Sequence, residues 1–129
     1  STAANYKMAT KNIFITGNTD LLILSILKKE DTYAYDIAKQ INAFSRGYLN
    51  LSNNTIYTAT YKLENNGYIS EYSRRVGKKR TRVYYHLEKE GELYLRELYD
   101  NYIKTMRGTN LVLKKFSDFG EGDHNEFNL

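Results

Sequence analysis

Residues 68–87 read YISEYSRRVGKKRTRVYYHL and combine two patterns. Both ends are rich in Tyr, Ile and Val, which favour β-strands, and the glycine and lysines between them favour a turn. The stretch therefore predicts a β-hairpin. Its tip, RRVGKKRTR at 74–82, has six basic residues among nine and no acidic one. Because side chains alternate along a strand, one of Tyr84 and Tyr85 should face inward and the other outward.

The positive charge of the chain is concentrated in this hairpin. The sequence of 129 residues has 19 basic and 15 acidic residues and a net charge of +4. Without the six basic residues of 74–82, the remaining 13 basic and 15 acidic residues carry a net charge of −2. A focal positive potential attracts polyanions, chiefly nucleic acid. A solvated turn kept soluble by its charges is the alternative interpretation of the run taken alone.

Three helical segments precede the hairpin. An almost continuous apolar run predicts a largely buried helix over about 20–29, with Thr19 as its N-cap. The segment 34–44 has apolar residues at helical spacing and predicts a second helix. Ser52 predicts the N-cap of a third helix, and Gly67 suits the position just after its end. One face of the third helix should carry Ile56, Ala59, Thr60 and Leu63.

A long helical pattern follows the hairpin over 88–116. Its apolar stripe is too wide for a single helix to bury against so small a domain. Pairing with a second copy would bury the stripe, so we predict a dimerisation helix. Gly108 weakens the pattern and predicts a bend or a stop. Outside these elements we expect an N-terminal segment over 1–18 and a disordered acidic tail over 117–129.

The order of three helices and a two-stranded hairpin is that of a winged helix-turn-helix. We therefore predict an α+β fold, mainly α, with a winged-helix domain over 19–87 and the long C-terminal dimerisation helix after it. In this arrangement the third helix enters the major groove of double-stranded DNA. The hairpin wing lies beside or within the neighbouring minor groove, where closely spaced phosphates favour Arg and Lys.

Two groups of residues are predicted to contact DNA. Amides and hydroxyls of the third helix suit base edges and phosphates, and a lysine adds charge; these residues are Asn54, Thr55, Tyr57, Thr58, Tyr61 and Lys62. The wing supplies the cations Arg74, Arg75, Lys78, Lys79, Arg80 and Arg82. The alternatives are a packing role for Tyr57 and a helix-start hydrogen bond for Asn54.

The segment SNNTIYTATYKLENNGYI, 52–69, followed by KKRTRVYYHLEKEG, 78–91, resembles the signature of the PadR family of bacterial transcriptional regulators. The matching residues are Ser52, Thr55–Tyr57, Leu63–Glu64, Gly67–Ile69, Arg82–Tyr85, Leu87 and Gly91, with Tyr35, Ile37 and Ala38 upstream. Thr58, Tyr61 and Glu88 depart from the family pattern. Since the first two lie on the predicted DNA face, the resemblance does not define the operator.

The resemblance implies a homodimeric repressor that binds an inverted-repeat operator. The short C-terminal region is similar to the compact subfamily with one C-terminal helix, that of the lactococcal multidrug-responsive repressor. In that relative an aromatic residue at the place of Tyr102 stacks on flat drug molecules between the subunits. A planar aromatic or phenolic effector is therefore implied, at an effector or dimer interface formed by Leu95, Leu98, Tyr99, Tyr102 and Met106.

Three alternatives remain open, one of which is a chiefly ligand-binding sensor with weak DNA contact. The stripe on the C-terminal helix could form a dimer core that binds no ligand, because an aromatic stripe at helical spacing is more often core than ligand site. The chain as a whole could be a protein-interaction module, in which the winged fold serves assembly and the basic wing meets an acidic partner.

The sequence gives no sign of an enzyme. It has no cysteine and no glycine-rich phosphate loop, and His86 and His124 belong to no catalytic or metal-binding pattern. We therefore expect no catalytic residues, no metal and no cofactor. No run of 18 apolar residues predicts a membrane span, so a cytoplasmic protein is expected.

Overall fold

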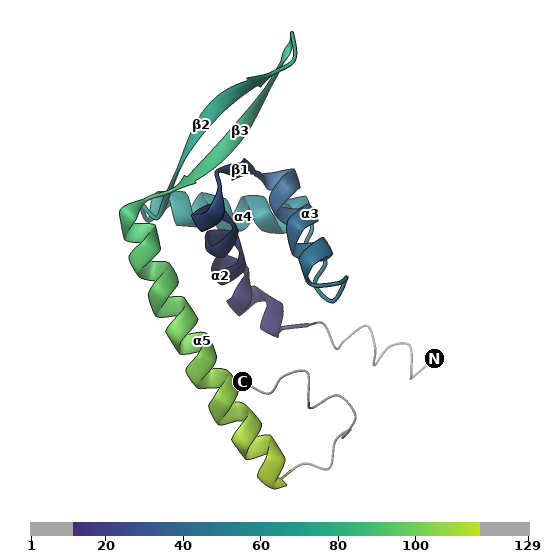
Figure 1. Cartoon of the computed structure of the whole chain (residues 1–129), viewed down its shortest axis with the longest axis vertical. Helices are drawn as coiled ribbons and strands as arrows, with labels where there is room; N and C mark the ends of the chain where they lie inside the picture. The colour runs from purple at the N-terminus through teal and green to yellow at the C-terminus, as the bar shows by residue number, and fades with distance from the viewer. Residues whose placement is uncertain (1–11, 117–129) are drawn as a thin grey trace. The chain divides into compact units, whose positions relative to one another are not determined.

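The computed structural model describes residues 12–116, and the chain divides into two units, residues 1–95 and 96–129. The expectations for the N-terminal end and the acidic tail therefore fall largely outside the described residues. The elements are α2 (Phe14–Lys29), β1 (Thr32–Tyr33), α3 (Ala34–Phe44), α4 (Asn53–Asn65), β2 (Ile69–Val76), β3 (Arg80–Leu87) and α5 (Lys89–Phe116), as Figure 1 shows. The predicted α+β fold, mainly helical, is confirmed.

The start of α2 differs from the prediction. The helix begins at Phe14 and not after an N-cap at Thr19. The side-chain oxygen of Asn12 accepts a hydrogen bond from the Phe14 N–H at 3.1 Å. Thr19 is buried inside the helix, where its hydroxyl donates to the carbonyl of Ile15 at 2.8 Å. The polar residues before the apolar run are thus helical and do not form a separate segment.

The helices of the first unit enclose a small apolar core. Figure 1 shows α2, α3 and α4 gathered at the base of the sheet, with the hairpin extending away from them. In α3 the buried side chains are those of Ala34, Ile37 and Ile41, whereas Tyr35 and Phe44 are exposed. The largest fully buried apolar side chains of the unit are Ile23, Leu24, Ile37, Ile56, Leu63 and Ile69.

Local hydrogen bonds fix both ends of α4. At its start the Ser52 hydroxyl accepts from the Thr55 N–H at 3.1 Å, as an N-cap does. At its end Gly67 has φ +76° and donates its N–H to the carbonyl of Glu64, and the following N–H donates to Leu63. These two bonds form a Schellman motif, which favours glycine at this position. Both predicted ends of the helix are confirmed.

The three strands form an antiparallel sheet in the order β1-β3-β2. The pairing of β2 with β3 runs from Ile69 and Leu87 at the base to Val76 and Arg80 beside the turn. Gly77 begins the turn with φ +75°, a conformation that side chains disfavour. The structure therefore contains the predicted hairpin.

Tyr85 and Tyr84 face opposite sides of the sheet, as the alternation predicted. Tyr85 is 5% exposed and faces the helices, and Tyr84 is half-buried on the outer side. The hydroxyl of Tyr85 lies 3.4 Å from the buried hydroxyl of Thr60 in α4. This contact joins the base of the hairpin to the helix that precedes it.

α5 is one continuous helix, so the predicted bend or stop at Gly108 does not occur. Its first turns pack tightly inside the first unit. Gly91 is buried, and a Cβ at this position would collide with the backbone carbonyl of Tyr68. The ring of Tyr68 also stacks on that of Tyr94, with centroids 4.2 Å apart. The base of the hairpin and the first turns of α5 thus form one packed joint.

Candidate nucleic-acid interface

The exposed face of α4 carries all six residues that the sequence predicted for DNA contact. The helix buries Ile56, Ala59, Thr60 and Leu63 and exposes Asn54, Thr55, Tyr57, Thr58, Tyr61 and Lys62. Tyr57 and Tyr61 are 53% and 67% exposed, so both rings are accessible to a partner. Asn65 is exposed one turn beyond Tyr61 on the same face and was not predicted.

Two hydroxyls of this face make bonds within the helix. The Thr55 hydroxyl lies 3.0 Å from that of Ser52, and the Thr58 hydroxyl donates to the carbonyl of Asn54 at 2.9 Å. Ser52 makes the cap at the start of the helix, which is the role considered as an alternative for Asn54. The Asn54 amide is therefore not needed for capping.

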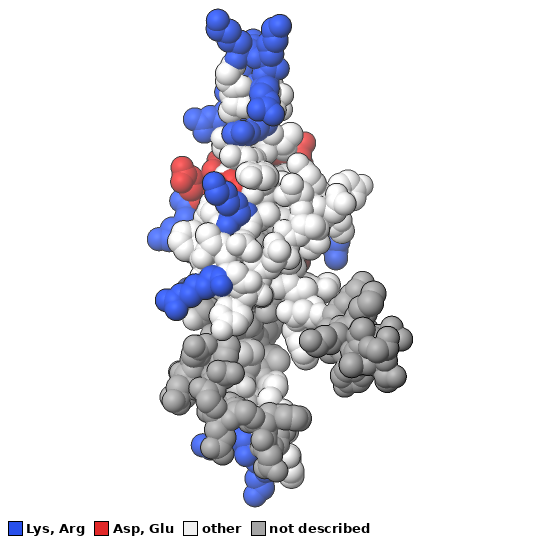
Figure 2. Space-filling view, turned by 90° about the vertical axis from the view of Figure 1, so that its right-hand side faces the viewer, with Lys and Arg blue, Asp and Glu red and all other residues white. Residues whose placement is uncertain are grey.

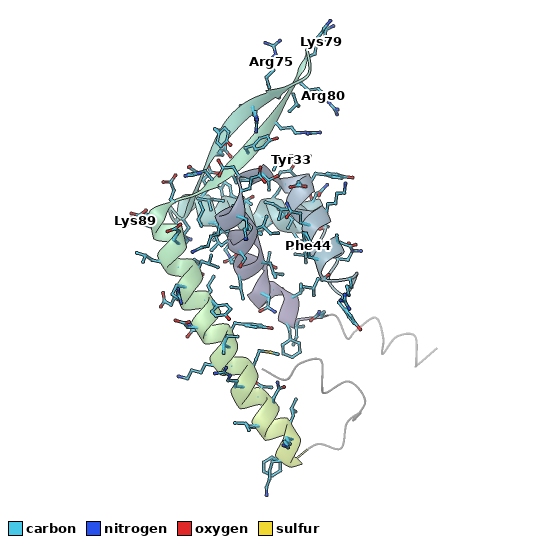
Figure 3. The ribbon with its side chains drawn as sticks, in the orientation of Figure 1. Tyr33, Phe44, Arg75, Lys79, Arg80 and Lys89 are labelled. Carbon is cyan, nitrogen blue, oxygen red and sulfur yellow. The ribbon has the colours of Figure 1, made fainter. Side chains whose placement is uncertain are left out.

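Three of the wing cations stand at the turn. Lys78, Lys79 and Arg80 are exposed there, and Figure 3 shows Arg75, Lys79 and Arg80 at the outer end of the hairpin. Arg75 stabilises the turn, because its guanidinium donates to the carbonyl of Lys78 at 2.7 Å. Figure 2 shows Lys and Arg covering the tip of the hairpin, with Asp and Glu toward its base. The positive potential is therefore strongest at the tip.

The remaining two wing cations lie over aromatic rings. Arg74 and Arg82 face each other in the strand register. The Arg82 guanidinium carbon is 4.3 Å from the ring centroid of Tyr33, and that of Arg74 is 5.2 Å from the centroid of Tyr84. The Tyr84 centroid lies 5.4 Å from that of Tyr33 and 5.7 Å from that of Tyr72. The outer side of the sheet thus carries a row of three rings, with a guanidinium over each of two of them.

Asp31, between α2 and β1, ties the base of the hairpin to the helices. One carboxylate oxygen accepts from the Tyr72 hydroxyl at 2.9 Å, and the other lies 2.9 Å from Nδ1 of His86. The hydrogen bond with Asp31 raises the pKa of His86, opposed by a smaller effect of burial. These bonds hold β2 and β3 against the loop that leads into α3.

A groove of about 570 Å³ lies between the hairpin and the start of α3 and α4. Tyr57 of α4, Tyr33 beside α3, and Arg82 of β3 are among its lining residues. Glu71 lines it as well, and burial together with this neighbouring carboxylate raises the pKa of Glu64. The groove has Arg80 and Arg82 toward the wing and one carboxyl group, that of Glu71, toward its base, so the part near the wing suits an anion better.

A second groove, of about 560 Å³, lies between α2 and α4. Asn54, Thr58 and Lys62 line it from α4, and Asp20 lines it from α2. Burial raises the pKa of Asp20, and the positive charge of Lys62 lowers it by less. Lys62 is thus a cation of the α4 face with an acidic neighbour in the groove.

The five residues predicted for an effector or dimer interface divide between the two units. Leu95 is buried inside the first unit. In the second, Leu98, Tyr102 and Met106 are half-buried, and Tyr99 is 51% exposed. The apolar stripe continues through Leu113 and Phe116, which are exposed. It therefore reaches the end of the described helix.

Among residues 12–116 no group of three or more His, Cys, Asp or Glu side chains could hold a metal ion. Within the same residues, every helix is too short or too polar to cross a bilayer.

A family model described as the PadR-like family of transcriptional regulators matches residues 23–97, which is more than half of the chain. The chain belongs to this PadR-like family. It is a family of transcriptional regulators and not of enzymes, which agrees with the expectation from the sequence. The finer resemblance, to the compact subfamily and its lactococcal repressor, stays a prediction.

Proteins similar to this PadR-like chain include two with solved structures and one known from its sequence. A transcriptional regulator of Clostridium thermocellum is 32% identical with a TM-score of 0.69, over 83% of this chain and 97% of that chain. An uncharacterized protein of Lysinibacillus sphaericus is 30% identical over 84 residues, which cover 65% of this chain and 77% of that protein. PadR of Bacillus subtilis, solved in complex with operator DNA, shares the fold at 24% identity and a TM-score of 0.57, over 60% of this chain and 44% of that one.

Proposed function

We propose that this chain is a homodimeric repressor that binds an inverted-repeat operator. Membership of a family of transcriptional regulators supports the proposal, as does a PadR of the same fold that was solved with operator DNA. The observation that carries it is the exposed polar row of α4 beside a hairpin that has six basic and no acidic residues over 74–82. Together they offer hydrogen bonds for base edges and cations for phosphates.

In the proposed complex α4 lies in the major groove. The Asn54 amide suits the edge of an adenine, which presents both a donor and an acceptor there. The hydroxyls of Tyr57 and Tyr61 suit backbone phosphates, and Lys62 adds charge. The wing tip lies at the neighbouring minor groove, where the negative potential attracts Lys and Arg without a demand on base geometry.

The length and apolar stripe of α5 support the homodimer. The helix has 28 residues and is therefore about 42 Å long. In the second unit it is the only element among the described residues, so no other described element of that unit covers its stripe. A second copy carries the same stripe. Two copies related by a two-fold axis would present their α4 helices to half-sites about 34 Å apart.

For release of the repressor we propose a planar aromatic or phenolic effector that stacks on Tyr102 between the paired α5 helices. Tyr99 and Met106, one turn to either side, would complete the apolar surface. Such an effector changes DNA affinity only by its difference in affinity for the two dimer shapes. Titration of a planar dye tests this site. Tyr102→Ala should abolish dye binding and leave the dimer intact, whereas dissociation without any change in dye affinity would favour the core-only alternative.

An electrophoretic shift with DNA from upstream of the chain's own gene tests the DNA-binding proposal. We expect a shift that survives excess nonspecific duplex. Asn54→Ala should lose about 1–3 kcal/mol of discrimination between the operator and nonspecific DNA, because a bidentate base contact is worth about that much. The matched control is Asn53→Ala, which removes the same amide one position earlier, about 100° around the helix. If excess nonspecific duplex abolished the shift equally in Asn54→Ala and Asn53→Ala, the protein-interaction alternative would be favoured.

A further inference from the structure

Arg74 and Arg82 occupy a position that two cations would ordinarily avoid. They are cross-strand partners on the outer side of the hairpin, and like charges directly opposite each other repel. In the described part of the chain no carboxylate forms an ion pair with either guanidinium. Instead each guanidinium lies over a ring, Arg82 over Tyr33 and Arg74 over Tyr84. The negative face of an aromatic ring attracts a cation, so the rings hold the two charges in place.

The ring under Arg82 does not come from the hairpin. Tyr33 belongs to β1, pairs with Tyr84 in the sheet register, and immediately precedes α3. Figure 3 shows Tyr33 where the hairpin meets the helices. The contact of 4.3 Å is the shorter of the two cation–ring contacts. Through Tyr33, a wing cation is therefore fixed to the helical part of the first unit.

A guanidinium that stacks on a ring can still bind a phosphate. The ring occupies one face of the planar group, and the N–H groups along its edge remain free to donate to an anion. The long arginine side chain loses much rotamer freedom when it is held in one place, so ordering it before DNA arrives reduces the cost of binding. Arg82 also lines the groove that Tyr57 of α4 lines. The part of the wing that carries Arg82 therefore borders the exposed face of α4.

We infer that Tyr33 is a positioning residue for DNA binding, whose ring holds the Arg82 guanidinium on the outer side of the wing, where its N–H groups donate to a backbone phosphate. The inference rests on the proposed DNA-binding function and assigns to the wing a cation that is fixed, in contrast to the unrestrained cations at the turn. Tyr33 itself need not touch the DNA.

The test is a graded series at Tyr33, with affinity for an operator duplex measured by fluorescence anisotropy on the full chain. Tyr33→Phe and Tyr33→Trp keep a ring and should bind within about twofold of the wild type. Tyr33→Leu keeps apolar bulk without the ring and should bind about two- to fivefold more weakly, the size expected for an exposed cation–ring contact. Tyr48→Leu is the matched control, since Tyr48 is 79% exposed and does not line the groove.

Combined variants test whether Tyr33 acts through Arg82. In an Arg82→Ala background, Tyr33→Leu should cause no further loss, because the side chain it positions is gone. A further loss of the same size would show that Tyr33 acts independently of Arg82 and would overturn the inference. Equal losses in Tyr33→Phe and Tyr33→Leu would overturn it too, because the hydroxyl and not the ring would then matter.

A substitution at Arg82, which is exposed, tests the inference without changing the packing of β1. Arg82→Lys retains the charge but loses the planar group that stacks on the ring, so its affinity should fall between those of the wild type and Arg82→Ala. Wild-type affinity in Arg82→Lys would contradict the inference while leaving the proposed function intact. If the wild-type chain bound no DNA at all, the proposed function would fail, and the inference with it.

Discussion

The base and the tip of the hairpin belong to the same two strands but have different surroundings. At the base Ile69, Tyr85 and Leu87 are buried, a third strand pairs alongside, and Asp31 bonds to both strands. Toward the tip the strands leave the helices, and none of residues 71–84 is buried. The base has apolar packing and directed hydrogen bonds, whereas the tip has charge.

This difference separates two properties of a DNA-binding protein, the stability of its fold and its affinity for DNA. Changes at the base should act on folding and on the direction in which the wing points. Changes at the tip should act on attraction to the duplex and leave folding unchanged, because exposed side chains contribute little to stability. Variants of the two halves can therefore be told apart by measuring unfolding and DNA affinity side by side.

The largest effect is expected at the joint below the base. Gly91→Ala should destabilise the fold by about 3 kcal/mol and lower Tm by roughly 10 °C, because the new methyl group meets the backbone carbonyl of Tyr68, which cannot rotate away. Thermal unfolding followed by circular dichroism measures this.

The same helix provides the control for this prediction. Nothing lies within 4 Å of a Cβ built at Gly108, so Gly108→Ala should raise Tm slightly through the better helix propensity of alanine. If both variants shifted Tm in the same direction, the packing assigned to Gly91 would be wrong.

The next effect is expected at the tip. Changing Lys78, Lys79 and Arg80 together to Ala should weaken binding to all DNA sequences alike, by about 10- to 100-fold near physiological salt. If two or three phosphates are neutralised by these residues, the slope of log affinity against log salt should flatten by about 2 to 3. Titrations at several salt concentrations measure both quantities, and Tm should stay unchanged.

Three lysines outside the wing give the matched control for charge. Lys28, Lys29 and Lys39 are exposed on α2 and α3, and their replacement by Ala removes the same three charges. The salt slope should then change by less than in the tip variant. Equal flattening in both would mean that net charge, and not its concentration in the hairpin, governs binding.

The smallest effect is a pH dependence at the base. The folded state raises the pKa of His86 above its usual 6.5, chiefly through the hydrogen bond with Asp31. Stabilisation by the charged pair is therefore complete below about pH 6.5 and is lost as the pH rises through the folded pKa. Exposed pairs contribute about 0–1 kcal/mol, so the change in stability should stay within that range.

Asp31→Asn changes both the pair with His86 and the bond from Tyr72, so the pH-dependent part of its difference from the wild type reports on the pair. The difference in Tm between the two proteins should be largest near pH 6 and shrink toward pH 8.5. A difference that grew with pH would contradict the assignment, because the pair would then stabilise the fold without the proton on His86.

Patterns within a single element were predictable from the sequence. The capping serine and the glycine that bound α4, its buried face, and the strands of the hairpin all depend on spacing and local propensity. Gly108 shows the limit of such patterns, because one glycine costs a long helix only about 1 kcal/mol and does not stop it. Thr19 shows another, since a polar residue that resembles a cap can bond inside a helix.

Contacts between distant segments were not predictable. Asp31 bonds to Tyr72 and His86 across 41 and 55 positions of the sequence, and no periodic pattern connects them. Tyr33 meets Arg82 only because β1, a strand of two residues, pairs with β3. The basic run over 74–82 and the order of elements identified the wing cations as a group, but their division into restrained and free side chains required the coordinates.

The short connection between α4 and β2 has a consequence for control of the protein. Only residues 66–68 separate the two elements, and the Schellman motif at Gly67 fixes the direction in which the chain leaves the helix. The direction of the hairpin relative to α4 is therefore set when the chain folds. A signal that releases the protein from DNA would therefore have to move α4 and the hairpin together, as one unit.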